Sequence, residues 1–164
     1  MAPEVKGHAH VITVSDGVSA GTREDVSGRA LVEILTSAGF EASGPEIVPD
    51  DQSRICDAIV SAVVSSNDVV VTTGGTGLGP RDVTPQATSM LIEYEVPGLG
   101  ELMRNAGASS TPMAWLSRGL AGVRGQTLIL NVPGSAKGAR ESLEAVMPVL
   151  PHAIQLLHGD TRHE

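Results

Sequence analysis

The part of this sequence best suited to hold a phosphate is a loop with three glycines in four residues. Gly74, Gly75 and Gly77 carry no Cβ atom, so the backbone can turn sharply and bring its N–H groups against an anion. Thr73 and Thr76 add hydroxyl donors to the same loop. A tight turn that only joins a strand to a helix has the same composition, so both interpretations stay open on the motif alone.

Two well-known phosphate-binding loops do not fit this pattern. A P-loop requires lysine and then serine or threonine after its last glycine, whereas Gly79 is followed by Pro80 and Arg81. The dinucleotide-binding fingerprint requires glycine or a similar residue three positions after Gly77, where this chain has proline. The sequence therefore disfavours an ordinary P-loop nucleotide hydrolase and a Rossmann dehydrogenase.

Two aspartates are candidates for acidic chemistry. Asp50 follows a strand signal and Asp82 follows the glycine loop, and each stands beside a helix start. Together they could hold Mg²⁺ against a nucleotide's phosphates, because Mg²⁺ favours one or two carboxylates plus phosphate oxygens. Such a metal would offset the charge that develops in phosphoryl or nucleotidyl transfer. The alternative is that both aspartates only cap helices.

Polar residues elsewhere are weaker candidates. Pro133-Gly134-Ser135 resembles a second anion-binding helix entry, although its serine could equally be a helix cap. Arg81 and Arg118 could pair with phosphate or lie solvated on the surface. Ser15 and Ser117 have no histidine at a recognisable spacing, which gives little support to a nucleophilic hydrolase.

The composition predicts a folded, acidic, cytoplasmic protein. Of 164 residues, 41% are hydrophobic and 18% are charged, which is typical of a chain that buries a core. The net charge of −8 argues against nucleic-acid partners, which are bound through Lys and Arg. The single cysteine, Cys56, excludes an intrachain disulfide. The chain lacks a signal-peptide pattern and any apolar run of about 18 residues, which predicts no membrane partner.

Strand and helix signals alternate along the chain. Strong strands are predicted at 11–15, 68–73 and 127–132, and a weaker one at 41–48 is interrupted by Gly44-Pro45. This alternation favours an α/β fold with a mainly parallel sheet that is covered on both faces. Helices are predicted near 27–38, directly after Pro49-Asp50-Asp51, from Thr84-Pro85 with Thr84 as cap, from Pro97, from about Ala136, and after Pro151.

The positions of the candidate loops suggest a single site. Ligands of parallel sheets bind at the carboxyl ends of strands, and three loops here follow predicted strands: 15–17, 73–77 and 131–135. If these strands are parallel neighbours, their loops share one rim. A structure that placed Gly75, Asp82 and Ser135 on distant faces would contradict this prediction.

At these loops the chain resembles the MogA/MoaB family of molybdenum-cofactor biosynthesis proteins. The resemblance implies a three-layer αβα fold, one molybdopterin-binding domain over residues 1–164 with a core at about 8–158, and assembly as a homotrimer or a hexamer of two trimers. Each matching stretch is weak alone, but together they run in the family's order. They are Val14-Ser15-Asp16, Val48-Pro49-Asp50-Asp51, 72–77, 81–85, 96–100, Leu116-Ser117-Arg118 and 130–135.

The resemblance also implies an activity. Family members bind molybdopterin, a pterin that carries a dithiolene and a terminal phosphate, and some contact other molybdenum-cofactor enzymes. In the adenylyltransferase branch, molybdopterin attacks MgATP, becomes adenylylated and releases pyrophosphate. The family's two functional carboxylates carry over to Asp50 and Asp82, with Mg²⁺ from MgATP. The implied substrate-binding residues are Ser15, Thr73, Gly74, Gly75, Thr76, Gly77, Thr84, Ser117, Arg118, Pro133, Gly134 and Ser135.

Alternatives from other functional classes remain open at this point. The stretch 15–25 looks closer to the MoaB side of the family, although the retention of Asp50 and Asp82 favours an enzyme. A non-catalytic molybdopterin-binding scaffold would bind but release no pyrophosphate. A regulatory nucleic-acid-binding domain is opposed by the acidic charge. A different pterin enzyme, such as a carbinolamine dehydratase, would need converging histidines, and those present lie near the chain ends: His8, His10, His152, His158 and His163.

Overall fold

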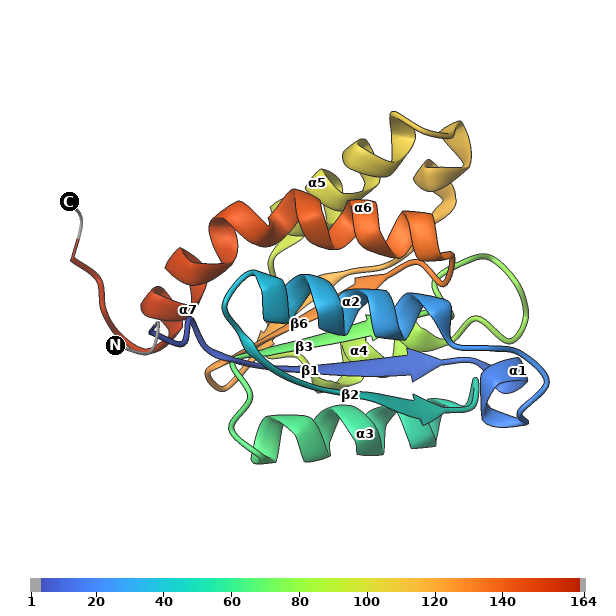
Figure 1. The fold of residues 1–164 in the computed structure, drawn as a ribbon, viewed down its shortest axis with the longest axis horizontal. Helices are drawn as coiled ribbons and strands as arrows, with labels where there is room; N and C mark the ends of the chain where they lie inside the picture. Colours follow the sequence, from blue (N-terminus) through green and yellow to red (C-terminus); the bar gives the residue numbers. More distant parts are fainter. Residues whose placement is uncertain (1–3, 163–164) are drawn as a thin grey trace.

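A six-stranded sheet of order β2-β1-β3-β6-β5-β4 forms the middle layer of the protein (Figure 1). The computed structural model describes residues 4–162. Strands β2, β1, β3 and β6 run parallel, whereas β5 and β4 pair antiparallel at one edge. The predicted mainly parallel α/β sheet is confirmed. The strands are β1 (His8–Val14), β2 (Glu41–Val48), β3 (Val69–Thr73), β4 (Tyr94–Glu95), β5 (Ala121–Arg124) and β6 (Thr127–Val132).

Helices cover both faces of the sheet (Figure 1). One face carries α2 (Val26–Ser37), α5 (Pro97–Ala108), α6 (Ala136–Val146) and α7 (Leu150–Leu157), and the other carries α3 (Gln52–Val64) and α4 (Thr84–Leu91). Short elements complete the chain: α1 (Asp16–Ser19) and the 3₁₀ turns η1 (Pro112–Leu116) and η2 (Met147–Val149). No helix within residues 4–162 combines the length and apolarity that crossing a bilayer requires.

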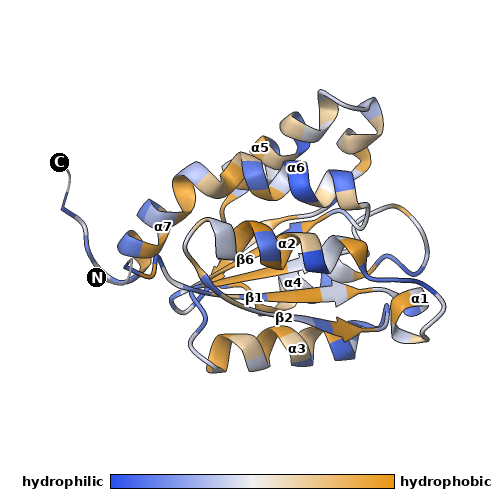
Figure 2. Cartoon of the chain, viewed as in Figure 1, coloured by the Kyte–Doolittle hydropathy of each residue, from blue (hydrophilic) through white to orange (hydrophobic). Residues whose placement is uncertain are grey.

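Two apolar layers, one on each face of the sheet, hold the three layers together. Along β3, Val69 and Val71 pack against the α2 and α6 side, while Val70 packs against α3 and α4. All three valines are fully buried, as the continuous β-branched run predicts for a central strand covered on both faces. Figure 2 shows the strands predominantly apolar and the outer helix surfaces mixed with polar residues.

The predicted interruption of the second strand is wrong. β2 continues through Gly44-Pro45 by means of a β-bulge. Gly44 and Pro45 together oppose one residue of β1, Val11, so the register between the two strands shifts there. Gly44 has φ +98°, and a Cβ at this position would run into the carbonyl oxygen of Val11. Because β2 lies at the edge of the sheet, a proline without an N–H is tolerated there.

Two features near the other edge were not predicted correctly. Thr84 is the first residue of α4 rather than its cap, and the capping position is Val83, which makes no side-chain cap. The stretch before Arg124 gave no clear sequence signal, yet it contains β5. β5 is short, but its antiparallel partner β6 follows directly across a turn at Gly125, whose φ of +60° suits a tight hairpin.

Candidate functional site

The carboxyl ends of β1, β3 and β6 meet at one rim of the sheet. Thr73 at the end of β3 is in register with Thr13 of β1 and with Val132 of β6. The loops that follow therefore lie against one another: a Cβ on Gly134 would lie 3.2 Å from the Cα of Gly74. The prediction that these three strands are parallel neighbours is confirmed.

A cavity of about 660 Å³ opens at this rim. Gly75, Asp82 and Ser135 all line it. These three residues therefore lie at one rim and not on distant faces of the protein. The carboxylates of Asp50 and Asp82 enter it from different loops. Among the other predicted site residues, those that line this cavity are Ser15, Thr73, Gly74 and Gly134.

Asp50 is held by Asp16, a residue to which the sequence assigned no role. The backbone N–H of Asp16 donates to Asp50 Oδ2 at 2.9 Å, and the backbone N–H of Asp50 donates to Asp16 Oδ1 at 3.0 Å. This reciprocal pair ties the loop after β1 to the loop after β2. Asp50 does not cap α3, because that role belongs to Asp51, whose Oδ1 accepts from the backbone N–H of Arg54.

Arg81 forms the other side of this arrangement. Its Nε and Nη2 atoms donate to the two oxygens of Asp16 at 2.7 and 3.0 Å, the bidentate geometry that suits a guanidinium and a carboxylate. The hydrogen bond from Arg81 lowers the pKa of Asp16. The carboxylate of Asp16 is therefore occupied by a cation, whereas that of Asp50 has no direct cationic partner among residues 4–162.

The local environment makes Asp50 costly to ionise. Burial raises the pKa of Asp50, and although the N–H of Asp16 lowers it, the negative charges of Asp16 and Asp82 raise it further. A carboxylate in such surroundings gains strongly from a bound cation, which offsets both the burial and the repulsion.

Asp82 is bound into the glycine loop. Its Oδ2 accepts the backbone N–H of Gly79 at 2.9 Å, and its own N–H donates to the carbonyl of Gly79 at 3.0 Å. A Cβ on either Gly77 or Gly79 would lie 2.9 Å from Asp82 Oδ2, so the loop can wrap this closely only with glycine. Helix capping, the alternative considered for both aspartates, therefore does not account for either of them.

The glycine loop presents backbone donors to the rim. Gly74 and Gly75 have φ values of +104° and +69°, a backbone conformation that side chains with a Cβ rarely adopt. Within residues 4–162, the N–H groups of Gly75, Thr76 and Gly77 donate to no acceptor. The N–H groups at the start of α6 lie beside this loop. Such a set of free donors next to a helix start is suited to an anion.

Two predicted substrate-binding residues instead stabilise the loop from behind. Thr84 is fully buried, and its hydroxyl donates to the carbonyl of Gly74 at 2.9 Å. The guanidinium of Arg118 donates to the carbonyls of Gly77 and Asp82 at 2.9 and 2.8 Å and to Gln86 Oε1. Neither residue lines the larger cavity or the smaller one that adjoins it. In this structure both residues orient the glycine loop, and direct contact of either with substrate stays a prediction.

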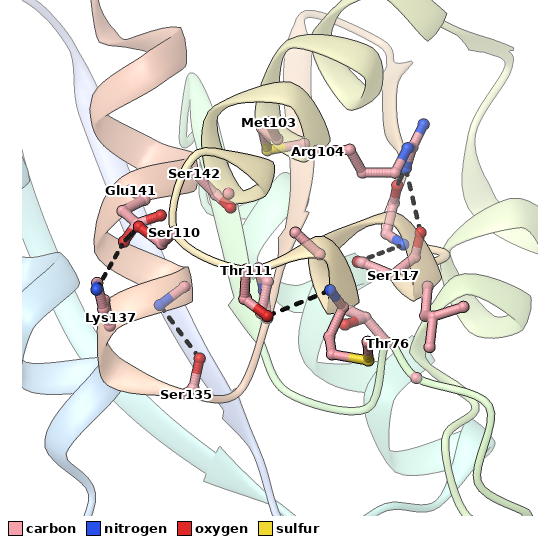
Figure 3. Close-up of a pocket in the computed structure, with 18 of the residues that line it drawn as sticks. Thr76, Met103, Arg104, Ser110, Thr111, Ser117, Ser135, Lys137, Glu141 and Ser142 are labelled. Atoms are coloured by element: carbon pink, nitrogen blue, oxygen red, sulfur yellow. Dashed lines mark hydrogen bonds and ion pairs between the residues drawn. The ribbon is translucent and has the colours of Figure 1, made fainter.

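A second cavity of about 290 Å³ adjoins the first and lies between α5, η1 and the start of α6 (Figure 3). Its walls are largely apolar and include Met103, Met113 and Leu116. Ser135 lines both cavities and caps α6 by accepting the N–H of Gly138. The other predicted site residues that line this smaller cavity are Thr76, Gly77, Ser117 and Pro133.

The sequence alone did not indicate the smaller cavity. Most of its wall comes from residues 100–119, where the chain forms most of α5 and a 3₁₀ turn. The apolar spacing after Pro97 predicts the helix there but gives no sign of a cavity beside it. The motifs at 96–100 and 116–118 border it and were the only signal that could have located it.

Histidine chemistry has no place in either cavity. None of the four histidines within residues 4–162 lines them, and His163 lies outside the described residues. The same part of the chain holds no group of three or more His, Cys, Asp or Glu side chains that could form a metal site by itself. The acidic residues that line the larger cavity are Glu24, Asp25, Asp50 and Asp82. Both oxygens of Asp25 already accept hydrogen bonds, from the Thr13 hydroxyl and the backbone N–H of Gly28, whereas Asp50 and Asp82 each keep one oxygen free within residues 4–162.

Replacing Asp16 by asparagine is expected to move the acid limb of the pH–rate profile to lower pH. The change keeps the backbone hydrogen bond to Asp50 but removes a negative charge that raises the pKa of Asp50. Asp50 then stays ionised at lower pH, so the acid limb should shift in that direction. Turnover rates across the acid range measure this. A structural role for Asp16 alone would lower the rate equally at every pH.

Comparison with known proteins agrees with this geometry. Residues 10–152 match a family described as "Probable molybdopterin binding domain". A molybdopterin adenylyltransferase of Helicobacter pylori strain J99 is 41% identical over 156 residues, covering 93% of this chain and 89% of that protein. The Escherichia coli K12 protein of the same name is 39% identical over 165 residues, covering 91% and 84%. The solved structure of the molybdopterin biosynthesis enzyme MoaB from Thermus thermophilus superposes with a TM-score of 0.87 at 53% identity, covering 93% and 97%.

Proposed function

The chain belongs to the MogA/MoaB family of molybdopterin-binding proteins, and on that premise we propose that it adenylylates molybdopterin with ATP. It is an enzyme of molybdenum-cofactor biosynthesis, a molybdopterin adenylyltransferase. The observation that carries this conclusion is the pair of adjoining cavities that share Ser135, one polar with Asp50 and Asp82 in its wall and one largely apolar. Two substrates whose phosphates must meet require such a pair.

The two cavities suit different parts of the substrates. The larger cavity, with Asp50, Asp82 and the free N–H group of Gly75, takes the phosphates of ATP, and the free N–H groups of Thr76 and Gly77 face the smaller cavity beside it. The smaller cavity, with Met103 and Met113 in its walls, takes the flat pterin ring. The terminal phosphate of molybdopterin then reaches the rim near Ser135, where the cavities meet. The proposal includes the domain bounds: one molybdopterin-binding domain over residues 1–164, with a core at about 8–158.

The donor set at the rim fits magnesium that arrives with ATP. One oxygen each of Asp50 and Asp82 is held by a backbone N–H, and the other accepts no hydrogen bond within residues 4–162. Two carboxylates completed by phosphate oxygens match the preference of Mg²⁺. Asp50 and Asp82 would hold the ion, which supplies positive charge against the phosphates. The raised pKa of Asp50 supports this, because a cation relieves the cost of its ionisation.

The reaction needs no protein nucleophile. An oxygen of the molybdopterin phosphate forms a bond to the α-phosphorus of ATP, and the bond to the oxygen shared with the β-phosphorus breaks as pyrophosphate leaves. The task of the chain is to bring two anions together and to stabilise the charge that develops. The N–H groups of Gly75, Thr76 and Gly77 and those at the start of α6 supply fixed donors for this purpose.

Release of pyrophosphate from molybdopterin and MgATP tests the proposed function. We expect the purified chain to release pyrophosphate only when both substrates are present, and to form adenylylated molybdopterin in equal amount. Asp82→Asn should lower this rate by about 100-fold or more, because a charge facing the phosphates is lost. Binding of molybdopterin without pyrophosphate release would instead support a non-catalytic scaffold of the same family.

Assembly as a homotrimer, or a hexamer of two trimers, is part of the proposal. Large apolar side chains that are exposed in the single chain support it, among them Leu78 at 68%, Met90 at 69% and Trp115 at 56%. Burial of such side chains between subunits favours association.

A further inference from the structure

One carboxylate lies in the wall of the otherwise largely apolar smaller cavity. It belongs to Glu141 on α6, whose side chain is 22% exposed. Its Oε1 accepts the hydroxyl of Ser110 at 2.8 Å, and Lys137 Nζ lies 4.0 Å from the same oxygen. Lys137 is 76% exposed, so this pairing contributes little. Within residues 4–162, the second oxygen, Oε2, accepts no hydrogen bond.

The surroundings of Glu141 combine hydrogen-bonding groups with flat apolar walls. Figure 3 draws Glu141, Ser110 and Ser142 together on the α6 side, with Met103 on α5 nearby. The hydrogen bond from Ser110 ties the segment after α5 to α6 and fixes the carboxylate between them. The free oxygen of this half-buried carboxylate is open to the cavity, and a ligand that covers it must supply a donor, because an acceptor buried without a partner is costly.

The edge of a pterin ring supplies the donors that this site lacks. The 2-amino group and the N3–H of an aminopyrimidinone point in nearly the same direction, and a carboxylate can accept both in parallel. The neighbouring carbonyl of the ring accepts a hydrogen bond, which a serine hydroxyl can donate. The ring faces would pack against the methionine side chains, whose sulfur atoms make favourable contacts with aromatic rings.

We propose that Glu141 is a specificity-determining residue that reads the aminopyrimidinone edge of the pterin, and that Ser110 orients it. The inference rests on the proposed function, in which the smaller cavity takes the pterin ring. As a consequence, the smaller cavity discriminates between the flat rings of the two substrates and accepts the pterin rather than adenine. Adenine presents an amino group beside the lone pair of a ring nitrogen, which a carboxylate repels, so Glu141 keeps ATP out of this cavity.

Ring fluorescence allows a direct test with free pteridines. We would titrate the protein with 6-hydroxymethylpterin and with 6-hydroxymethyllumazine, in which a carbonyl replaces the 2-amino group. The wild type is expected to bind the pterin about 10- to 100-fold more tightly, because lumazine leaves a buried acceptor facing an acceptor. Glu141→Gln should lose at least about ten-fold of this preference, since its amide N–H groups face the pterin donors. ATP affinity at the larger cavity, which Glu141 does not line, should not change.

Two further variants keep the test decisive. Glu144→Gln makes the same chemical change on the exposed face of the same helix and should behave as the wild type. Ser110→Ala leaves the carboxylate in place but removes its orienting hydrogen bond, and should reduce the preference by a few-fold. If Glu141→Gln folds and keeps the full preference, the inference is overturned while the proposed function stands. If the wild type binds ATP but neither pteridine, the placement of the pterin in this cavity fails as well.

Discussion

Replacing Asp50 by asparagine is expected to lower adenylylation by about 100- to 1000-fold while making the protein more stable at neutral pH. The loss of activity is expected because Asp50 lines the larger cavity with Asp82 and would contribute negative charge to the proposed Mg²⁺ site. The fold should persist, because the amide oxygen of asparagine can still accept the backbone N–H of Asp16. Pyrophosphate release and thermal denaturation measure the two effects separately.

The gain in stability follows from the direction of the pKa shift. Burial and two neighbouring carboxylates raise the pKa of Asp50 above its value in the unfolded chain, about 3.9. Between these two values the folded state binds more protons, so the free energy of unfolding falls as the pH rises through that range. Above the folded pKa, ionised Asp50 opposes folding. Asparagine cannot ionise, so the variant should melt at a higher temperature at pH 7, and the difference should close below the unfolded value.

Asp51→Asn is the matched control for this prediction. Asp51 is the next residue, caps α3 and does not line the cavity, and asparagine caps a helix as well as aspartate does. Its turnover should equal that of the wild type. A Tm for Asp50→Asn below that of the wild type at pH 7, or turnover within ten-fold of it, would contradict the prediction.

Replacing Gly75 by alanine should disturb both the fold and the site. Gly75 has φ +69°, and its new Cβ would collide with Thr84 Oγ1 and lie 3.3 Å from Asp50 Oδ1. The left-handed backbone costs about 1–2 kcal/mol for alanine, and overpacking adds about 1–3 kcal/mol. Because the loop must move away from Thr84 and Asp50 Oδ1 must give by a few tenths of an ångström, we expect turnover to fall by about ten-fold or more. Denaturant unfolding and the pyrophosphate assay measure these losses.

Gly21→Ala separates backbone strain from crowding. Gly21 has a similar φ of +76°, but a Cβ there would meet nothing within 4 Å. This variant should lose only the backbone contribution, about 1–2 kcal/mol, and should keep its turnover. Equal losses of stability and activity in both variants would show that crowding against Thr84 and Asp50 has no part in the effect.

Taken together, the contacts explain why the glycines surround Asp82. Glycines at 77 and 79 allow the loop to close on the carboxylate of Asp82, and glycine at 75 leaves room beside the carboxylate of Asp50, which belongs to another loop. Arg118 donates to two carbonyls of the loop from its outer side. The backbone that positions Asp82 leaves the N–H groups of Gly75, Thr76 and Gly77 free, so one short segment combines a carboxylate with free backbone donors.

The main elements and the rim were predictable from local sequence. The β-branched runs at 69–73 and 127–132 are long, apolar and bounded by glycine or proline, so their strands were predicted almost to the residue. Because strand–helix alternation imposes parallel neighbours, the shared rim of the glycine loop and Ser135 followed from the order of elements. Local patterns sufficed here because each residue's environment is set by its own strand or loop.

Other parts depend on contacts between segments distant in the chain. The pairing of Asp16 with Asp50 joins residues 34 positions apart, and no periodic pattern marks it. Thr84 has the sequence signal of a helix cap. Its hydroxyl instead donates to the carbonyl of Gly74, because the glycine loop lies against the start of α4.

The sequence by itself therefore determined the α/β sheet, the glycine loop and the two candidate acids, since these follow from backbone freedom, burial and residue type. Only the tertiary structure decided which groups face the two cavities. Arg118 and Thr84 donate to carbonyls of the loop instead, and Glu141 and Ser110, which are 31 residues apart in the chain, meet at the smaller cavity. The physical reason is that a side chain's role depends on which donors and acceptors lie within about 3 Å of it. Packing between elements sets the distance from a side chain to its hydrogen-bond partners, and this distance cannot be predicted from composition or periodicity.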